Sequence, residues 1–186
     1  MKIALILFST LLVLFFIFQI YTVMATSQTN AQPYTVLQQE EEYEIRYYPS
    51  AVIATMKTQA KNFKELGRRG FRTLAGYIFG GNDENKSIAM TTPVQMEMND
   101  SVSSMSFIMP KEYTLLSLPK PTDDQVKLSQ SKEAFIAAIS FGGFASEKDI
   151  QNNIEKLKKA LNKHGIRYYG SFKFLGYNPP YQLVNR

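Results

Sequence analysis

Residues 62–79 read NFKELGRRGFRTLAGYIF, an amphipathic segment whose apolar residues fall on two faces of a helix. At about 100° per residue, one face carries Phe63, Leu66, Gly70, Leu74 and Tyr77. The other face carries Phe71, Ala75 and Phe79. The first face is suited to a hydrophobic core. The second needs a further explanation, because leaving a phenylalanine in water forgoes about 1.5–3 kcal/mol of burial.

Arg68 and Arg72 flank this second face. Because arginine pairs with carboxylates through two parallel hydrogen bonds, an apolar strip beside arginines is suited to a flat apolar ligand that carries carboxylates. The alternative is that both faces are buried between two layers of one fold. The residues alone leave both interpretations open.

Length and composition indicate one globular domain, since the chain has 186 residues and is 45% hydrophobic. The net charge of +5 comes from scattered lysines and arginines with no basic block, so nucleic acid is not an expected partner. The absence of cysteine excludes a disulfide framework, a thiolate metal site and a cysteine nucleophile.

The N-terminus predicts a hydrophobic helix that directs the chain to a membrane. The run Ile3 to Phe18 contains no charge and continues to Met24, which is long enough for a bilayer span of about 20 residues. Val23-Met24-Ala25 also fits a signal-peptide cleavage site. Residues 1–25 are therefore predicted as a membrane anchor or signal peptide, residues 26–33 as a linker and residues 34–186 as the domain. Both alternatives place the domain on the extracytoplasmic side, membrane-anchored or secreted.

The domain itself reads as an α+β fold. Pro49-Ser50 is a hairpin signal between two strands, Gly80-Gly81 ends the helix described above, and Ser146 is suited to cap a second helix that ends at Gly165. The predicted strands are 43–48, 51–57, 88–98, 104–109, 126–131, 135–141 and one or two within 168–177. Because strands and a helix recur in the same order, the sequence predicts a weak internal duplication.

Catalytic and metal-binding patterns are sparse. His164 is the single histidine and lies in the last turn of the second predicted helix, where the helix dipole favours a structural or solvated role. Without a second histidine or any cysteine, a zinc site is not expected. No Gly-x-Ser-x-Gly nucleophile motif is present. We therefore predict no catalytic residue and no metal site.

Several motifs together resemble the SOUL haem-binding protein family. They are Phe71–Asn82 (FRTLAGYIFGGN), Ile88–Val94 (IAMTTPV), Phe107–Pro110 (FIMP), Leu118–Pro121 (LPKP), Phe141–Gly143 and Gly176–Pro180. The resemblance covers residues 43–180 in order. It implies duplicated βαββ units that form a distorted β-barrel or a sheet pair with two helices, and it implies tetrapyrrole binding without turnover.

The resemblance also implies a place for the ligand. In haem-binding members the porphyrin lies against the outer face of the first domain helix, with an arginine near its propionates. That arginine matches Arg68, and the apolar contacts match Phe71 and Ala75; the two-face pattern adds Arg72 and Phe79. We expect non-covalent haem or another tetrapyrrole as the ligand, with haem buffering or carriage as the role.

Two other classes of function stay open. The βαββ plan also resembles GyrI-like small-molecule-binding modules, some of which are hydrolases, and a hydrolase would need a pocket carboxylate such as Glu97 or Glu44. Alternatively, the second apolar face docks a protein partner or the membrane surface, as exposed apolar patches often do.

Overall fold

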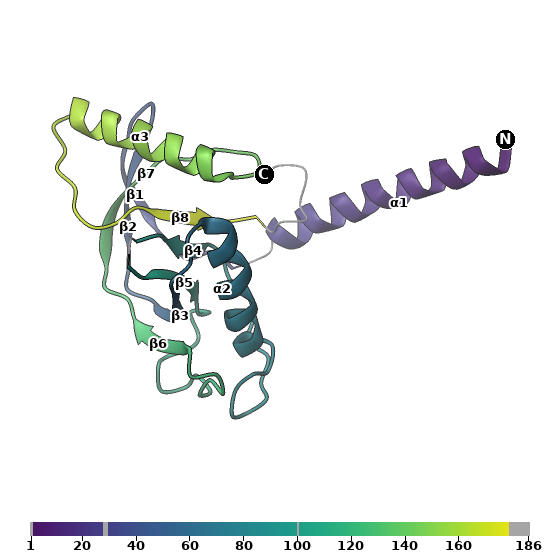
Figure 1. Ribbon diagram of the computed structural model, residues 1–186, viewed down its shortest axis with the longest axis horizontal. Helices are drawn as coiled ribbons and strands as arrows, with labels where there is room; N and C mark the ends of the chain where they lie inside the picture. Colours follow the sequence, from purple (N-terminus) through teal and green to yellow (C-terminus); the bar gives the residue numbers. More distant parts are fainter. Residues whose placement is uncertain (1, 28–29, 100, 179–186) are drawn as a thin grey trace.

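The computed structural model describes residues 2–27, 30–99 and 101–178, which contain three helices and eight strands (Figure 1). The helices are α1 (Lys2–Ser27), α2 (Phe63–Ile78) and α3 (Glu147–Lys163). The strands are β1 (Thr35–Gln39), β2 (Glu44–Tyr48), β3 (Val52–Thr58), β4 (Val94–Glu97), β5 (Ser103–Ile108), β6 (Val126–Gln130), β7 (Ala134–Ala138) and β8 (Lys173–Gly176). They form two antiparallel sheets, ordered β1-β2-β7 and β6-β3-β5-β4-β8. The fold is therefore a mixed α and β sheet pair, and the described strands do not close into a barrel.

The hairpin predicted at Pro49-Ser50 is wrong, because β2 and β3 belong to different sheets. β2 pairs with β7 and β3 pairs with β6 in one shared register, with Tyr48 opposite Ala134 and Val52 opposite Gln130. At the bend the Ala51 N–H donates to Ser131 Oγ at 2.9 Å, and the Ser131 N–H donates to the Ala51 carbonyl at 2.8 Å. Strands commonly switch sheets at such bends. Pro49 therefore marks a bend in one long strand pair and not a chain reversal. We call this bend, where Ala51 pairs with Ser131, the corner.

Helix α2 forms as its sequence predicts. The Asn62 side chain caps it by accepting a hydrogen bond from the Glu65 N–H, and Phe79 is its C-terminal cap residue. Its inner face packs on β5 and β3 of the five-stranded sheet, as Figure 1 shows. The buried residues of this main core include Leu66, Leu74, Tyr77, Met105 and Phe107. The prediction of one core-facing side for this helix is confirmed.

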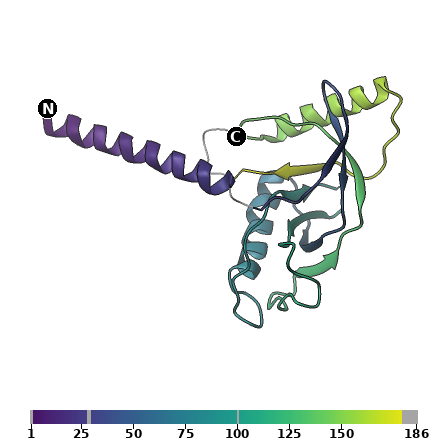
Figure 2. The same ribbon diagram turned by 180° about the vertical axis from the view of Figure 1, so that it is seen from behind.

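Helix α3 begins at a capping box in which Ser146 and Asp149 exchange side-chain and backbone hydrogen bonds, as Ser146 predicts. It packs through Leu157, Ala160 and Leu161 on a second, smaller core that includes Tyr43 of the β1–β2 loop. Figures 1 and 2 show α3 on the side of the molecule where β7 and β8 lie. The fold therefore has two separate hydrophobic cores, one under each domain helix.

The strands differ from the prediction in the extent of 88–98 and in the presence of β1, and one of the one or two strands predicted within 168–177 forms. Within the predicted strand 88–98, only β4 is regularly paired. Pro93, the residue just before β4, has no N–H to donate to a sheet ladder. Pairing within 168–177 is confined to β8, and β1 was not predicted at all. Within the described residues, α2 is followed by β4 and β5 whereas α3 is followed by β8 alone, so the internal duplication stays a prediction.

Helix α1 extends away from the two sheets in both views (Figures 1 and 2). Over the part of the chain that the structure describes, no helix combines the length and apolar content of a membrane span. The assignments of residues 1–25, 26–33 and 34–186 stay predictions.

Candidate functional site

The five residues predicted to bind a ligand share the outer surface of α2. Phe71 is 40% exposed and Phe79 is 65% exposed. Arg68 and Arg72 are exposed as well, and Ala75 is half-buried between them. Burial of both helix faces between two layers is thus ruled out. We call this surface the α2 face.

The inner side of α2 explains why the α2 face points outward. Gly70 sits so close to β5 that a Cβ atom there would lie 2.8 Å from Met105 Cβ and Sδ. This close contact fixes the rotation of α2 about its axis. Phe71, the next residue, therefore lies at the edge of the contact between α2 and the sheet. The Phe71 ring meets the buried Phe107 ring edge-on at a centroid distance of 5.6 Å. Phe71 is therefore held in place while one side of its ring stays accessible.

The arginines of α2 differ in whether they have partners. Arg69 pairs with Glu65 at 3.3 Å, one helical turn earlier. Arg68 and Arg72 form no ion pair with any described residue. An unpaired guanidinium presents its donors in a fork that matches a carboxylate. The α2 face thus offers two free guanidinium groups beside two accessible phenyl rings.

Small residues lie among these side chains. Gly76 is exposed, and a Cβ atom placed there would meet nothing within 4 Å. At about 100° per residue, Ala75 lies between Phe71 and Phe79 and Gly76 lies just beyond Phe79, so small residues keep this part of the surface low. A planar molecule can rest on such a surface with its edges against the rings and its carboxylates at the arginines.

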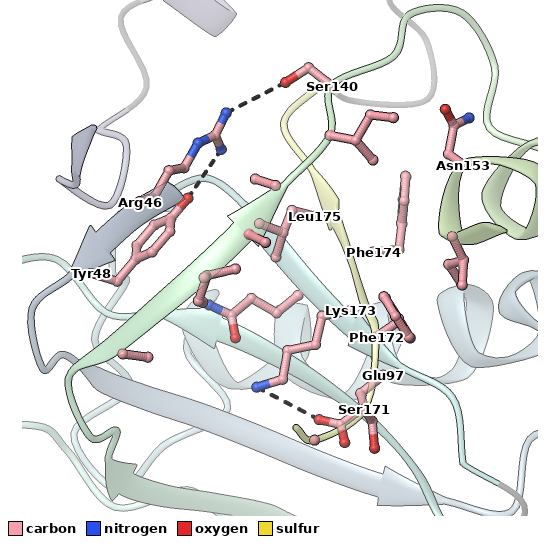
Figure 3. A pocket seen from close by; sticks show the side chains of 18 of the residues that line it. Arg46, Tyr48, Glu97, Ser140, Asn153, Ser171, Phe172, Lys173, Phe174 and Leu175 are labelled. Atoms are coloured by element: carbon pink, nitrogen blue, oxygen red, sulfur yellow. Dashed lines mark hydrogen bonds and ion pairs between the residues drawn. The ribbon is translucent and has the colours of Figure 1, made fainter. Parts of the chain in front are cut away.

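A cavity of about 900 Å³ lies elsewhere, between β7, β8 and α3 (Figure 3). None of the five predicted residues lines it. The main walls are the consecutive residues 134–141 and 166–178, and residues of α3, β2, β4 and the start of α2 add to them. Prediction from the sequence missed this cavity. Its one local signal was the density of aromatic residues between Tyr168 and Tyr177.

Arg46 of β2 lines the cavity within a polar network. Its guanidinium pairs with Glu44, donates to the Tyr48 hydroxyl at 3.2 Å and to Ser140 Oγ at 3.4 Å, and lies 4.4 Å from the centre of the Tyr34 ring. Figure 3 shows Arg46, Tyr48 and Ser140 together on one side of the cavity. Hydrogen bonds to Glu44 and Tyr48 outweigh burial and raise the pKa of Arg46, so the group stays charged.

The carboxylates that a hydrolase would need are both engaged. Glu44 holds Arg46, and Glu97 lies 3.7 Å from Lys173 Nζ and accepts from Asn99 Nδ2. Glu97 lines the cavity, whereas Glu44 does not. His164 Nδ1 lies 2.7 Å from the Tyr43 hydroxyl, a structural contact beside the smaller core. Among the described residues, no group of three or more histidine, aspartate or glutamate side chains is placed to hold a metal ion.

Comparison with known proteins identifies the family. The family model of the SOUL heme-binding protein matches residues 29–186. The chain belongs to the SOUL family. The chain is 28% identical to human heme-binding protein 2 over 152 residues, which is 77% of this chain and 74% of the relative. It is 26% identical to heme-binding protein 1 of Xenopus laevis over 153 residues, 77% of this chain and 79% of the relative.

A third relative extends the match. Heme-binding protein 1 of Sus scrofa is 26% identical over 165 residues, which is 83% of this chain and 87% of that protein. The names of these SOUL relatives describe binding proteins and not enzymes. The family resemblance carried by the sequence motifs is confirmed. The roles of Arg68, Phe71, Arg72, Ala75 and Phe79 stay predictions.

Proposed function

We propose that this SOUL-family chain binds haem or a related tetrapyrrole on the α2 face, non-covalently and without turnover. The observation that carries the proposal is the pair of accessible rings, Phe71 and Phe79, beside two guanidinium groups that form no ion pair with the residues that the structure describes. The names of the relatives supply the class of ligand.

The residues of the α2 face fit a tetrapyrrole that carries propionates. The macrocycle would lie on Ala75 and Gly76 and contact the rings of Phe71 and Phe79. Arg68 and Arg72 would hold the propionates, and each charge-assisted hydrogen bond stabilises the complex by about 1.5–3 kcal/mol. When bound, haem would supply its own colour and redox chemistry, while the protein binds and orients it.

A haem titration of the full chain, followed by Soret absorbance, tests the site. We expect Arg68→Ala and Phe71→Ala each to weaken binding by about tenfold or more, since each removes more than about 1.4 kcal/mol of interaction. Arg69→Ala is the matched control, because Arg69 is already paired with Glu65. Equal affinity of the wild type and all three variants rejects the α2 face as the haem site.

We further propose that the domain acts outside the cytoplasm, exported or anchored through residues 1–25, and buffers or carries haem there. The charge-free run after Lys2 supports this placement. Protease digestion of intact cells that express a tagged full chain provides the test. Digestion of the tag from outside is the expected result, and the mass of the mature chain distinguishes cleavage near Ala25 from retention. A tag protected in intact cells and found in the soluble fraction contradicts export.

A further inference from the structure

The charges of α2 are divided along its length. Its charged side chains all lie between positions 64 and 72, and they are Lys64, Glu65, Arg68, Arg69 and Arg72. Residues 73–79, which follow, carry no charge, and the last turn of the helix has no basic residue. The helix dipole adds a partial negative charge at this C-terminal end. A carboxylate of a ligand is therefore favoured over the first half of α2 and disfavoured over the second half.

The loop that follows α2 adds no net positive charge at this end. It contains Asp83, Glu84 and one basic residue, Lys86. The Lys86 ammonium lies 5.2 Å from the centre of the Tyr113 ring. Lys120, from the segment that pairs with this loop, is adjacent to Asp83, because its backbone N–H donates to Asp83 Oδ1 at 2.7 Å. The cations on which a carboxylate can depend are therefore those of the helix itself.

Arg68 and Arg72 lie on the α2 face one helical turn apart. Four residues separate them by about 6 Å along the axis and by about 40° around it. The acidic side chain of the helix, Glu65, is engaged by Arg69 at 3.3 Å and by the Lys61 N–H at 3.0 Å. No described acidic side chain pairs with Arg68 or Arg72. Both guanidinium groups are thus placed to bind carboxylates at the same end of the face.

The uncharged half of the α2 face lies in line with these arginines. Phe79 follows Arg72 by seven residues, which is about 10.5 Å along the axis and only about 20° around it. Along the axis between them lie Ala75, which is half-buried, and Gly76, where a Cβ atom would meet nothing within 4 Å. A macrocycle that covers Ala75 and Gly76 therefore has one edge at Arg72 and the opposite edge at Phe79.

We propose that the α2 face selects tetrapyrroles whose carboxylates all lie on one edge of the macrocycle. Arg68 and Arg72 receive that edge, and Phe79 receives the opposite, uncharged edge. A carboxylate on the opposite edge loses water beside Phe79 without gaining a partner, which weakens binding. This selectivity rests on the proposed function, since it needs a tetrapyrrole on the α2 face. It adds the direction in which the ligand lies and the pattern of substituents that the site accepts.

Fluorescence titration of the full chain with metal-free mesoporphyrins tests the proposal, with protein-free buffer as the blank. Mesoporphyrin IX carries its two propionates on neighbouring pyrrole rings and therefore on one edge. An isomer with the two propionates on opposite rings has the same composition and the same apolar substituents. We expect the wild type to bind mesoporphyrin IX at least about tenfold more tightly, because the isomer can bring only one propionate to the arginines.

Substitutions on α2 assign this preference to its cause. Arg72→Gln leaves a single guanidinium for either porphyrin, so the preference should fall to about twofold or less. Arg69→Gln is the matched control and should keep the full preference, because Arg69 is already paired with Glu65. Phe79→Arg places a cation at the opposite edge and should raise the affinity for the isomer toward that for mesoporphyrin IX. The dipole favours an arginine at the C-terminal end of a helix, so this variant should fold.

The possible failures separate the selectivity from the site. Equal affinity of the wild type for the two mesoporphyrins, with binding still weakened by Phe71→Ala, rejects the selectivity and leaves the α2 face as the site. A preference that persists in Arg72→Gln also rejects it, because the arginine pair is then not the cause. If mesoporphyrin IX binds equally to the wild type, Arg68→Ala and Phe71→Ala, the site itself is wrong and the proposed function fails with the selectivity.

Discussion

At the scale of single residues, Gly70 and Gly76 differ sharply although both lie within α2. A Cβ atom at position 70 would lie 2.8 Å from Met105 Cβ, which is too close for ordinary packing. A Cβ atom at position 76 would meet nothing within 4 Å. One glycine is therefore required by the approach of α2 to β5, and the other is not.

This difference gives a prediction for stability. Gly70→Ala should lower the free energy of unfolding by about 1–3 kcal/mol, because it overpacks the contact with Met105. Gly76→Ala should raise it by up to about 1 kcal/mol, because alanine restricts the unfolded chain and favours helix. Urea denaturation measures both changes. Destabilisation of the same size in the two variants contradicts the close contact at Gly70.

The buried hydroxyl of Tyr77 makes the stability of the main core depend on pH in the alkaline range. Its side chain is 1% exposed, and its hydroxyl donates to the Pro119 carbonyl at 3.0 Å. Burial raises the pKa of Tyr77 from its ordinary value of 10.0 to about 12. The folded state thus favours the protonated phenol, and this contribution to stability is complete below pH 10 and is lost as the pH rises toward 12.

Comparing the wild type with Tyr77→Phe isolates this effect. At pH 8 the variant should be less stable by about 1 kcal/mol, since the hydrogen bond to Pro119 is gone. Between pH 10 and 12 the wild type should lose stability faster than the variant, which has no group to ionise at this position. Parallel curves of unfolding free energy against pH would show that Tyr77 ionises equally in both states.

At the scale of elements, the two domain helices are joined at their N-termini by Glu147. The backbone N–H groups of Phe63 and Lys64, at the start of α2, both donate to Glu147 Oε1. Glu147 is itself the first residue of α3. A carboxylate is favoured at a helix N-terminus by the unpaired N–H groups and by the dipole. One side chain thus stabilises α2 from a neighbouring element.

Removal of this carboxylate should loosen the start of α2. We expect Glu147→Ala to lower the free energy of unfolding by about 0.5–2 kcal/mol, the range for loss of a helix cap. Amide hydrogen exchange at Phe63 and Lys64 should become faster. Lys148→Ala, one residue away and exposed, is the control and should leave those amides unchanged. Unaltered exchange in Glu147→Ala would show that the cap contributes nothing in solution.

At the scale of the whole molecule, the two hydrophobic cores should open separately. The core under α2 contains many more buried residues than the core under α3, which relies on Tyr43, Leu157, Ala160 and Leu161. Regions with fewer buried contacts open at lower free energy. We expect amides of α3 and β7 to exchange faster than those of α2 and β5 under native conditions. Uniform protection across both cores would show a single cooperative unit.

The parts of the fold that follow local rules were predictable from the sequence. Ser146 caps α3 as predicted, and the apolar period of residues 62–79 separates the core side of α2 from the α2 face. The Asn62 cap of α2 follows the same local rule, although it was not predicted. The bend at Pro49 was not predictable, because a hairpin and a corner share the same turn residues. Which one forms depends on pairing with residues 126–138, about 80 positions later.

The candidate sites divide in the same way. All residues of the α2 face come from one helix, so periodicity was enough to bring them together. The cavity is built from β2, β7, α3 and β8, which are distant in sequence. Arg46 illustrates the difficulty, because a charged residue in a short strand reads as solvent-facing until Glu44, Tyr48 and Ser140 are seen around it.

The corner has a consequence for the chain as it leaves the ribosome. β2 and β3 are synthesised long before β6 and β7, because Ser131, the partner of Ala51 at the corner, comes 80 residues later in the chain. Until then the edges of β2 and β3 that will receive β7 and β6 have no partner and are open to non-native pairing. Such long-range contacts slow folding, so we expect the nascent chain to stay open to chaperone capture until roughly 80 further codons have been translated.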